Sequence, residues 1–89
     1  MSKVSIAGMR VSLTAKEFSL LEFFMRHSGE VLTRSRLIEH VWDFAFDGDS
    51  NVVDVHIRNV RAKIDRPFGR ASLQTVRGSG YRLHDETLD

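Results

Sequence analysis

Hydrophobic residues recur with the spacing of an α-helix in the central part of the chain. Between residues 51 and 64, Val53, Ile57, Val60 and Ile64 fall on one stripe at 100° per residue. This stripe predicts an amphipathic helix that packs on the core of the protein. The opposite face of the same helix is formed by Asn51, Val55, Arg58, Asn59 and Ala62.

The outer face of this predicted helix is unusual because it contains no acidic residue. A solvent-exposed face commonly pairs acids with bases four residues apart. Amides and arginine form paired hydrogen bonds with base edges, and an exposed valine can contact a thymine methyl group. The face therefore favours a groove of DNA, with an ordinary helix of unusual outer composition as the alternative.

Alternating hydrophobic and polar residues predict a β-hairpin at the N-terminus. With residues 7–8 as the loop, Ile6 faces Met9 and Val4 faces Val11, so the apolar side chains share one side. A lone hairpin is marginally stable in water. We therefore expect its apolar side to pack on another element.

Two further helices are predicted before the central one. Thr14 and Glu17 have the spacing of a capping box, and the helix that they begin runs to about Gly29. Thr33 can cap a second helix that ends near Trp42. The apolar residues of both helices are interpreted as core.

Arg34 and Arg36 lie in the first turn of this second helix. The helix dipole disfavours cations at this end. Their placement is explained if a bound phosphate lies there, and the alternative is that both side chains extend into water.

A second hairpin is predicted near the C-terminus. Residues 73–76 and 81–83 form its two strands, and Gly78 and Gly80 allow the turn between them. Arg77 lies at the glycine-rich tip, where an arginine can enter a DNA minor groove.

The order of the predicted elements is hairpin, helix, brief strand at residues 31–32, helix, loop, helix, hairpin. Two helices of which the second is directed at a groove form a helix-turn-helix. A terminal hairpin with an arginine at its tip is a wing. The sequence therefore predicts an α+β fold, a winged helix-turn-helix, as a single domain over residues 1–89.

Charge is distributed unevenly along the chain, although its formal net charge is +1. Residues 51–82 hold seven Lys or Arg against two Asp or Glu, as a polyanion-binding surface requires. The absence of cysteine excludes disulfides and thiolate metal sites. Without an apolar stretch of membrane-spanning length or a recognisable signal peptide, we expect a cytoplasmic protein with no membrane contact.

The motifs of the chain resemble a known family. They are LTAKEFSLL at residues 13–21, VLTR at 31–34, HVW at 40–42, VDVHIR at 53–58 and QTVRGSGYR at 74–82. Together they resemble the DNA-binding effector domain of OmpR/PhoB-type bacterial response regulators, over residues 10–83. The resemblance implies a two-component transcription factor that binds double-stranded DNA.

The resemblance also implies roles for single residues. Base edges would be read by Val55 and Asn59 in the major groove, and Arg77 would reach the minor groove. The DNA backbone would be contacted by Trp42, Asn51, His56, Arg58, Arg61, Thr75 and Tyr81. The loop over residues 43–49 would contact RNA polymerase through Phe44, Phe46 and Asp47, unless one of the two rings packs in the core.

Two features of the chain differ from the family pattern. Family members often have arginine where this chain has Asn51 and Asn59, so their sequence preference cannot be transferred. Their effector domain also usually starts with two more strands and follows a receiver domain. We therefore expect an excised or truncated effector domain that acts beside a receiver domain in the full-length protein and binds DNA as a dimer.

Other classes of function fit the sequence less well. The four histidines are far apart and lack helical metal-ligand spacing, so neither an enzyme nor a metal or cofactor site is expected. A winged helix that binds only protein is the more serious alternative. The acid-free helix face and Arg77 argue against it.

Overall fold

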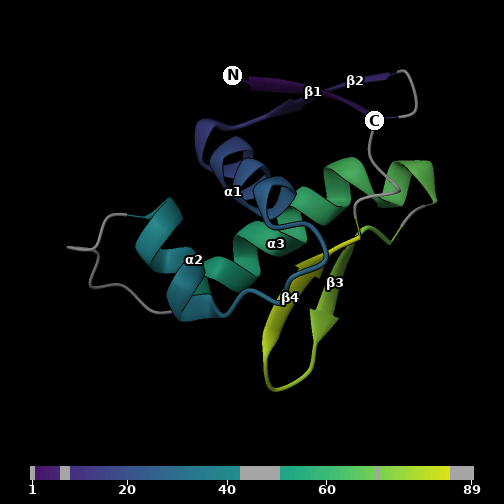
Figure 1. Ribbon diagram of the computed structural model, residues 1–89. Helices are drawn as coiled ribbons and strands as arrows, with labels where there is room; N and C mark the ends of the chain where they lie inside the picture. The colour runs from purple at the N-terminus through teal and green to yellow at the C-terminus, as the bar shows by residue number, and fades with distance from the viewer. Residues whose placement is uncertain (1, 7–8, 43–50, 70, 85–89) are drawn as a thin grey trace.

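The computed structural model describes residues 2–6, 9–42, 51–69 and 71–84. In these ranges three α-helices lie between a hairpin at each end, with one short 3-10 helix before the second hairpin (Figure 1). The elements are β1 (Ser2–Ile6), β2 (Met9–Leu13), α1 (Ala15–Arg26), α2 (Arg34–Val41), α3 (Asn51–Ile64), η1 (Arg66–Phe68), β3 (Leu73–Val76) and β4 (Gly80–Leu83). The predicted winged-helix architecture is confirmed.

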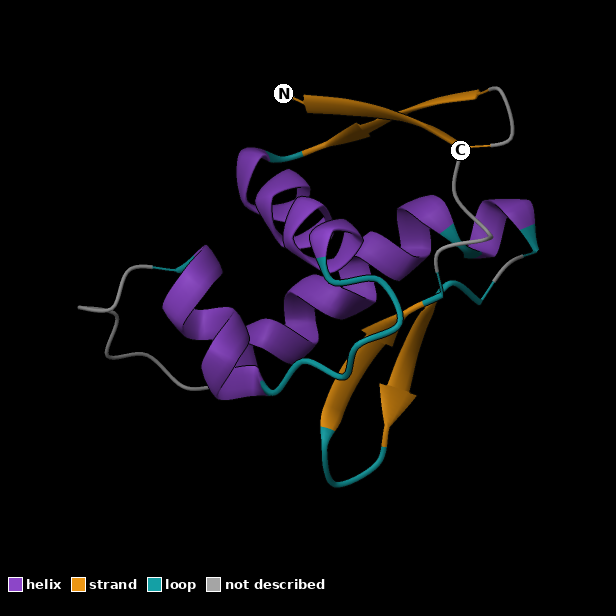
Figure 2. Ribbon diagram, in the orientation of Figure 1, coloured by secondary structure: helices purple, strands orange, loops and turns teal. Residues whose placement is uncertain are grey.

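The N-terminal hairpin has the predicted register. Val4 pairs with Val11 and Ile6 with Met9 across the antiparallel strands β1 and β2. The hairpin lies at the top of the molecule, beyond α1, and away from the C-terminal hairpin (Figure 2).

Helix α1 begins with the predicted capping box. The Thr14 side chain accepts a hydrogen bond from the Glu17 amide at 3.1 Å, and the Glu17 carboxylate accepts one from the Thr14 amide at 2.9 Å. The same carboxylate is buried and receives Lys63 Nζ from α3 at 2.6 Å. One acidic side chain therefore caps α1 and joins it to the last turn of α3.

The predicted apolar stripe of α3 packs into the core. Val53, Ile57, Val60 and Ile64 are all buried, as the helical spacing predicted. Figure 1 shows α3 crossing behind α1, with α2 at its N-terminal end and the C-terminal hairpin below. The core is completed by Leu13, Leu20, Leu21, Phe24, Leu32, Leu37, Trp42, Leu73, Tyr81 and Leu83.

The C-terminal hairpin, which we call the wing (residues 73–83), is attached to the body by backbone bonds. Leu32 donates to the Tyr81 carbonyl at 2.7 Å, and Tyr81 donates to the Leu32 carbonyl at 3.0 Å. The predicted brief strand at residues 31–32 is thus a single bridge to β4. On the other strand, buried Asp65 accepts hydrogen bonds from Ser72 Oγ and from the Leu73 amide.

Candidate nucleic-acid interface

The outer face of α3 is exposed, as the sequence predicted. Its side chains do not join the core, because the buried stripe takes the other side of the helix. Val55 is 36% exposed, which is unusual for a large apolar residue in this domain. The exposed residues of this face are Asn51, Val55, Arg58, Asn59 and Ala62.

The wing presents its own exposed residues beside this face. Arg77, Gly78 and Ser79 form the turn between β3 and β4, and all three are exposed. Gly78 has a φ of 76°, in the left-handed region that glycine adopts without strain. The turn therefore carries Arg77 to the end of the hairpin.

Gly80 is required by packing inside the protein. A β-carbon at this position would lie 2.1 Å from the Leu32 carbonyl oxygen and 2.9 Å from its carbon. The absent side chain lets β4 come close enough to form the bridge with residue 32. The sequence assigned this glycine to the turn of the hairpin, and the structure adds an internal reason for it.

A polar hollow of about 550 Å³ lies on the surface between α3, η1 and the wing. It is open to solvent, and its lining combines exposed positions of α3 with residues from the hairpin and from η1. The lining residues are Asn51, Asp54, Val55, Arg58, Arg61, Arg66 and Tyr81. Three arginines against one acid give this surface the positive charge that suits a polyanion.

Asp54 joins three elements at the edge of this hollow. Its carboxylate accepts a hydrogen bond from the Tyr81 hydroxyl of β4 and another from Arg34 Nε of α2, the latter at 2.9 Å. The Tyr81 bond and then the Arg34 bond lower the pKa of Asp54 against the opposing effect of burial. The carboxyl is thus held ionised and engaged within the protein.

The Tyr81 hydroxyl is engaged inside the protein rather than exposed as a ligand for phosphate. Only 5% of the residue is exposed, and its hydroxyl is bonded to Asp54. Burial and the bond to Asp54 raise the pKa of Tyr81, so that it remains a neutral donor. Arg34 also points to this site, with its Nη2 atom 3.5 Å from the Tyr81 hydroxyl.

Arg61 contacts the wing directly. Its Nε donates to the Leu73 carbonyl at 2.8 Å, and its Nη2 donates to Thr75 Oγ1 at 2.7 Å. The guanidinium also lies 5.6 Å from the centroid of the Tyr81 ring. Arg61 and Thr75, both expected at the DNA backbone, are therefore bonded to one another.

Trp42 and His56 are brought together by the fold. Trp42 follows α2 and is 9% exposed, with its ring edge-on to the His56 ring at 5.0 Å between centroids. The Nδ1 atom of His56 is 2.9 Å from the Val52 carbonyl. This bond fixes the ring and leaves His56 half-buried on the flank of α3.

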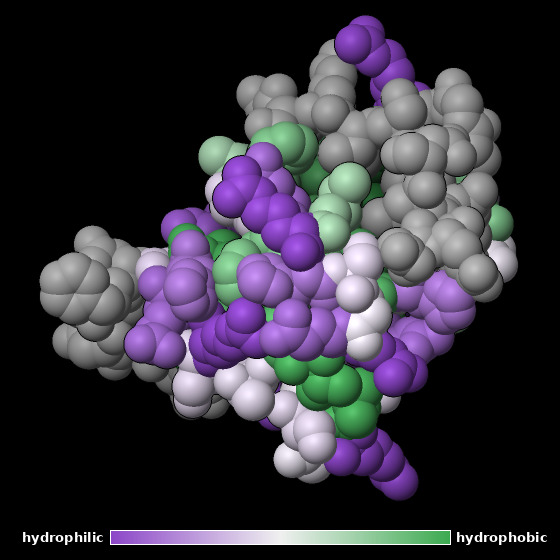
Figure 3. Space-filling model, viewed as in Figure 1, coloured by the Kyte–Doolittle hydropathy of each residue, from purple (hydrophilic) through white to green (hydrophobic). Residues whose placement is uncertain are grey.

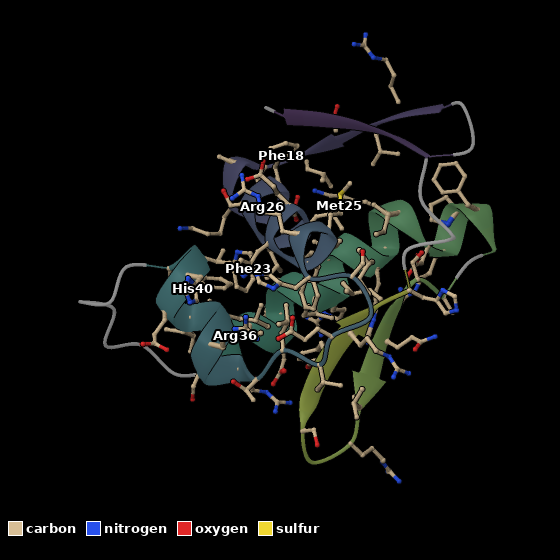
Figure 4. The ribbon with its side chains drawn as sticks, viewed as in Figure 1. Phe18, Phe23, Met25, Arg26, Arg36 and His40 are labelled. Atoms are coloured by element: carbon tan, nitrogen blue, oxygen red, sulfur yellow. The ribbon has the colours of Figure 1, made fainter. Side chains whose placement is uncertain are left out.

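Arg36 belongs to a separate cluster between α1 and α2. It is paired with Glu30, which also lies 3.1 Å from His27, and the hydrogen bond from Arg36 is the main cause that lowers the pKa of Glu30. Figure 4 shows Arg36 beside Phe23 and His40, whose rings stack at 4.9 Å. Neither of the two expectations for Arg36, a bound phosphate or free solvent, describes this arrangement.

Sequence reasoning missed the role of Asp54. A signal was present, because it is the only acidic residue among positions 51–64 and would be unfavourable beside phosphates unless it were paired.

The predicted polymerase-contact residues Phe44, Phe46 and Asp47 lie outside the described residues, so the structure does not test them. The surface seen in Figure 3 is largely hydrophilic over α2.

The described ranges hold neither a cluster of metal ligands nor a membrane-spanning helix. No group of three or more potential metal ligands occurs among these residues. None of their helices has both the length and the apolar character needed to cross a membrane.

Comparison with known proteins identifies the family. The family model described as "Transcriptional regulatory protein, C terminal" matches residues 8–83. The transcriptional regulatory protein CusR of Escherichia coli K12 is 54% identical over 81 residues, which cover 91% of this chain and 36% of CusR. The chain spans about a third of the length of the curated relatives that it matches.

Solved structures agree with this assignment. A mutant of RitR has a TM-score of 0.81 at 38% identity, covering 92% of this chain and 36% of the other. The DNA-binding domain of the response regulator AdeR, in complex with an intercistronic region, has a TM-score of 0.78 at 30% identity. That match covers 86% of this chain and 76% of the AdeR chain.

These matches also decide the broad class of function. The relatives are transcriptional regulators and not enzymes, which confirms the expectation of a non-enzymatic domain. The chain belongs to the OmpR/PhoB-type family of response-regulator DNA-binding domains.

Proposed function

We propose that this domain reads double-stranded DNA with α3 in the major groove and the tip of the wing in the adjacent minor groove. The observation that carries the proposal is the exposed, acid-free outer face of α3 beside a hollow that is rich in arginine. A helix fits the width of the major groove, and such a face offers it donors and acceptors. The similar DNA-binding domain of AdeR, solved in complex with an intercistronic region, supports binding to double-stranded DNA here.

Three residues are proposed to read the bases. Asn59 can form a bidentate pair with adenine, and Val55 can contact a thymine methyl group. Arg77 at the tip of the wing would enter the minor groove, whose potential attracts arginine where A·T pairs narrow it. All three residues are exposed: Val55 and Asn59 on α3, and Arg77 in the turn of the wing.

Phosphate contacts are proposed for the flanks of α3. Arg58 is exposed and lies on the same face as the base-reading residues, which makes it the main candidate. Asn51 begins the helix, and Trp42 with His56 forms the neighbouring edge. For Thr75, Arg61 and Tyr81, the bonds that they already form within the protein make a supporting role more consistent with their geometry.

The whole protein is proposed to be a response-regulator transcription factor of the bacterial cytoplasm. The greater length of its relatives leaves room for the receiver domain that the family implies. We further propose a dimer on DNA and contact with RNA polymerase through residues 43–49. These proposals rest on membership of the family.

The proposal is tested by selecting binding sites from random DNA and measuring affinity against salt. Each phosphate contact adds roughly 0.9 to the slope of log K against log salt, so specific binding should weaken steeply. Arg58→Ala should weaken all sequences alike and reduce this slope by about one unit. A failure to select any site, or binding that is insensitive to salt, would favour a protein-binding winged helix instead.

A further inference from the structure

Two polar residues of α3, Asp54 and Arg61, are directed at the wing. They are seven residues apart, so they lie two turns apart on nearly the same side of the helix. Asp54 receives the hydroxyl of Tyr81 on β4, and Arg61 donates to Thr75 on β3. Thr75 and Tyr81 are opposite each other in the antiparallel register, so both contacts reach the same cross-strand pair of the wing.

The two strands of the wing are held in different ways. Strand β4 is fixed on its outer side by two backbone bonds between Leu32 and Tyr81. Strand β3 has no such neighbour among the described strands, and its first residue is tied to Asp65. Further along β3, Arg61 of α3 donates a hydrogen bond to Thr75 Oγ1.

The geometry of Arg61 suits a brace between helix and strand. Its planar guanidinium reaches two acceptors on one strand, the Leu73 carbonyl and Thr75 Oγ1, at 2.8 Å and 2.7 Å. Two bonds from a rigid fork fix orientation as well as distance. Thr75 lies two residues before Arg77, so this brace acts close to the tip.

We infer that Arg61 is a positioning residue that holds β3, and with it Arg77, at a set angle to the recognition helix α3. This inference rests on the proposed function of the wing in the minor groove. It differs from the phosphate contact that the family resemblance implies, because the bonds of Arg61 are made to the protein. Its consequence is that the wing and α3 read DNA as one rigid unit with a fixed distance between their contacts.

The DNA experiment compares Arg61→Ala and Arg61→Lys with the wild type on the selected site, flanked by A·T or by G·C pairs. Lysine keeps the charge but lacks the fork that reaches both acceptors. We expect both variants to lose the flank preference, with the ratio of the two Kd values falling to about one. The salt slope should stay at its wild-type value in both.

A matched control is Arg82→Ala. Arg82 is exposed on β4 and donates to Gln74 within the hairpin at 3.1 Å, so its loss changes the charge of the wing without touching the brace. This variant should keep the flank preference. The inference is overturned if Arg61→Ala lowers the salt slope by about one unit, keeps the flank preference, and is rescued by Arg61→Lys.

A second measurement on the free protein does not depend on DNA. The chain has no cysteine, so spin labels can be attached through Ser79→Cys on the wing and Ala62→Cys on α3, both exposed. Arg61→Ala, and independently Thr75→Val, should broaden the distribution of distances between the labels, whereas Arg82→Ala should not. An unchanged distribution in a folded Arg61→Ala or Thr75→Val protein would overturn the inference.

The two experiments separate the inference from the proposed function. A wild-type protein without any flank preference would refute the minor-groove role of Arg77. The label distances would still decide whether Arg61 braces the wing.

Discussion

The close approach of Gly80 to Leu32 leads to a prediction about stability. In Gly80→Ala the new β-carbon would lie 2.1 Å from the Leu32 carbonyl oxygen, so the backbone of one segment must move. The φ of 146° adds strain for any residue with a side chain. Movement would also lengthen the two bonds between Leu32 and Tyr81, at 2.7 Å and 3.0 Å.

The expected cost can be assembled from these parts. Overpacking costs about 1–3 kcal/mol and a strained backbone conformation about 1–3 kcal/mol, so the substitution should destabilise the fold by roughly 2–6 kcal/mol. A domain of this size is stable by roughly 4–13 kcal/mol, so the loss is a large part of the total. Gly78→Ala is the matched control, since its φ of 76° is also left-handed but nothing lies within 4 Å of the added carbon.

Urea unfolding of the three proteins measures the difference. Gly78→Ala should cost only about 1–2 kcal/mol, the penalty for a left-handed conformation. Gly80→Ala should cost more and leave the slope of free energy against urea unchanged if both proteins unfold in two states. Equal costs for the two variants would mean that Leu32 gives way freely, and the argument from close packing would be wrong.

Other substitutions test the site and its surroundings. Asn59→Ala should lose about 1–3 kcal/mol on the selected site and little on random DNA, and equal losses on both would indicate a backbone contact. Arg77→Ala should weaken binding most where A·T pairs flank the site, and a parallel loss on G·C flanks would refute a minor-groove role. If Phe44 or Phe46 contacts polymerase, its replacement by serine should abolish activation in a transcription assay at unchanged DNA affinity, whereas a core ring would cost about 3–5 kcal/mol of stability in thermal unfolding. Burial is the largest single effect and raises the pKa of Glu17, but the hydrogen bonds and charge of Lys63 and the hydrogen bonds of Thr14 together lower it below its ordinary value. The contribution of Glu17 to stability is therefore present above the unfolded pKa and is lost as pH falls through the lower folded pKa. Melting temperatures from pH 7 to 3 should fall less steeply in Glu17→Gln.

Local and periodic features of the fold could be predicted from the sequence. The spacing of Val53, Ile57 and Val60 predicted α3, and its observed bounds agree with those predicted, Asn51–Ile64. The capping box of Thr14 and Glu17 was predictable because its partners are three residues apart. Such features depend on neighbours in the sequence, which are known before the fold.

The destinations of long polar side chains could not be predicted in the same way. The helical period places Arg61 on a flank of α3, but its guanidinium ends on a strand that is distant in sequence. Likewise, Arg34 and Arg36 appeared to need phosphate because their acidic partners, Asp54 and Glu30, are outside the helix that holds them. The hydrophobic pattern fixes the direction of a side chain, and the packing of other elements decides what it meets.

The Glu17 carboxylate has a consequence for how the domain folds. It closes the cap of α1 locally, and it also receives Lys63, a residue 46 positions further along the chain. Initiation of α1 and docking of the end of α3 are therefore stabilised by the same group. A partially folded chain with α1 alone would leave this acid without its cation, so the two helices should gain protection from hydrogen exchange together, as one cooperative unit.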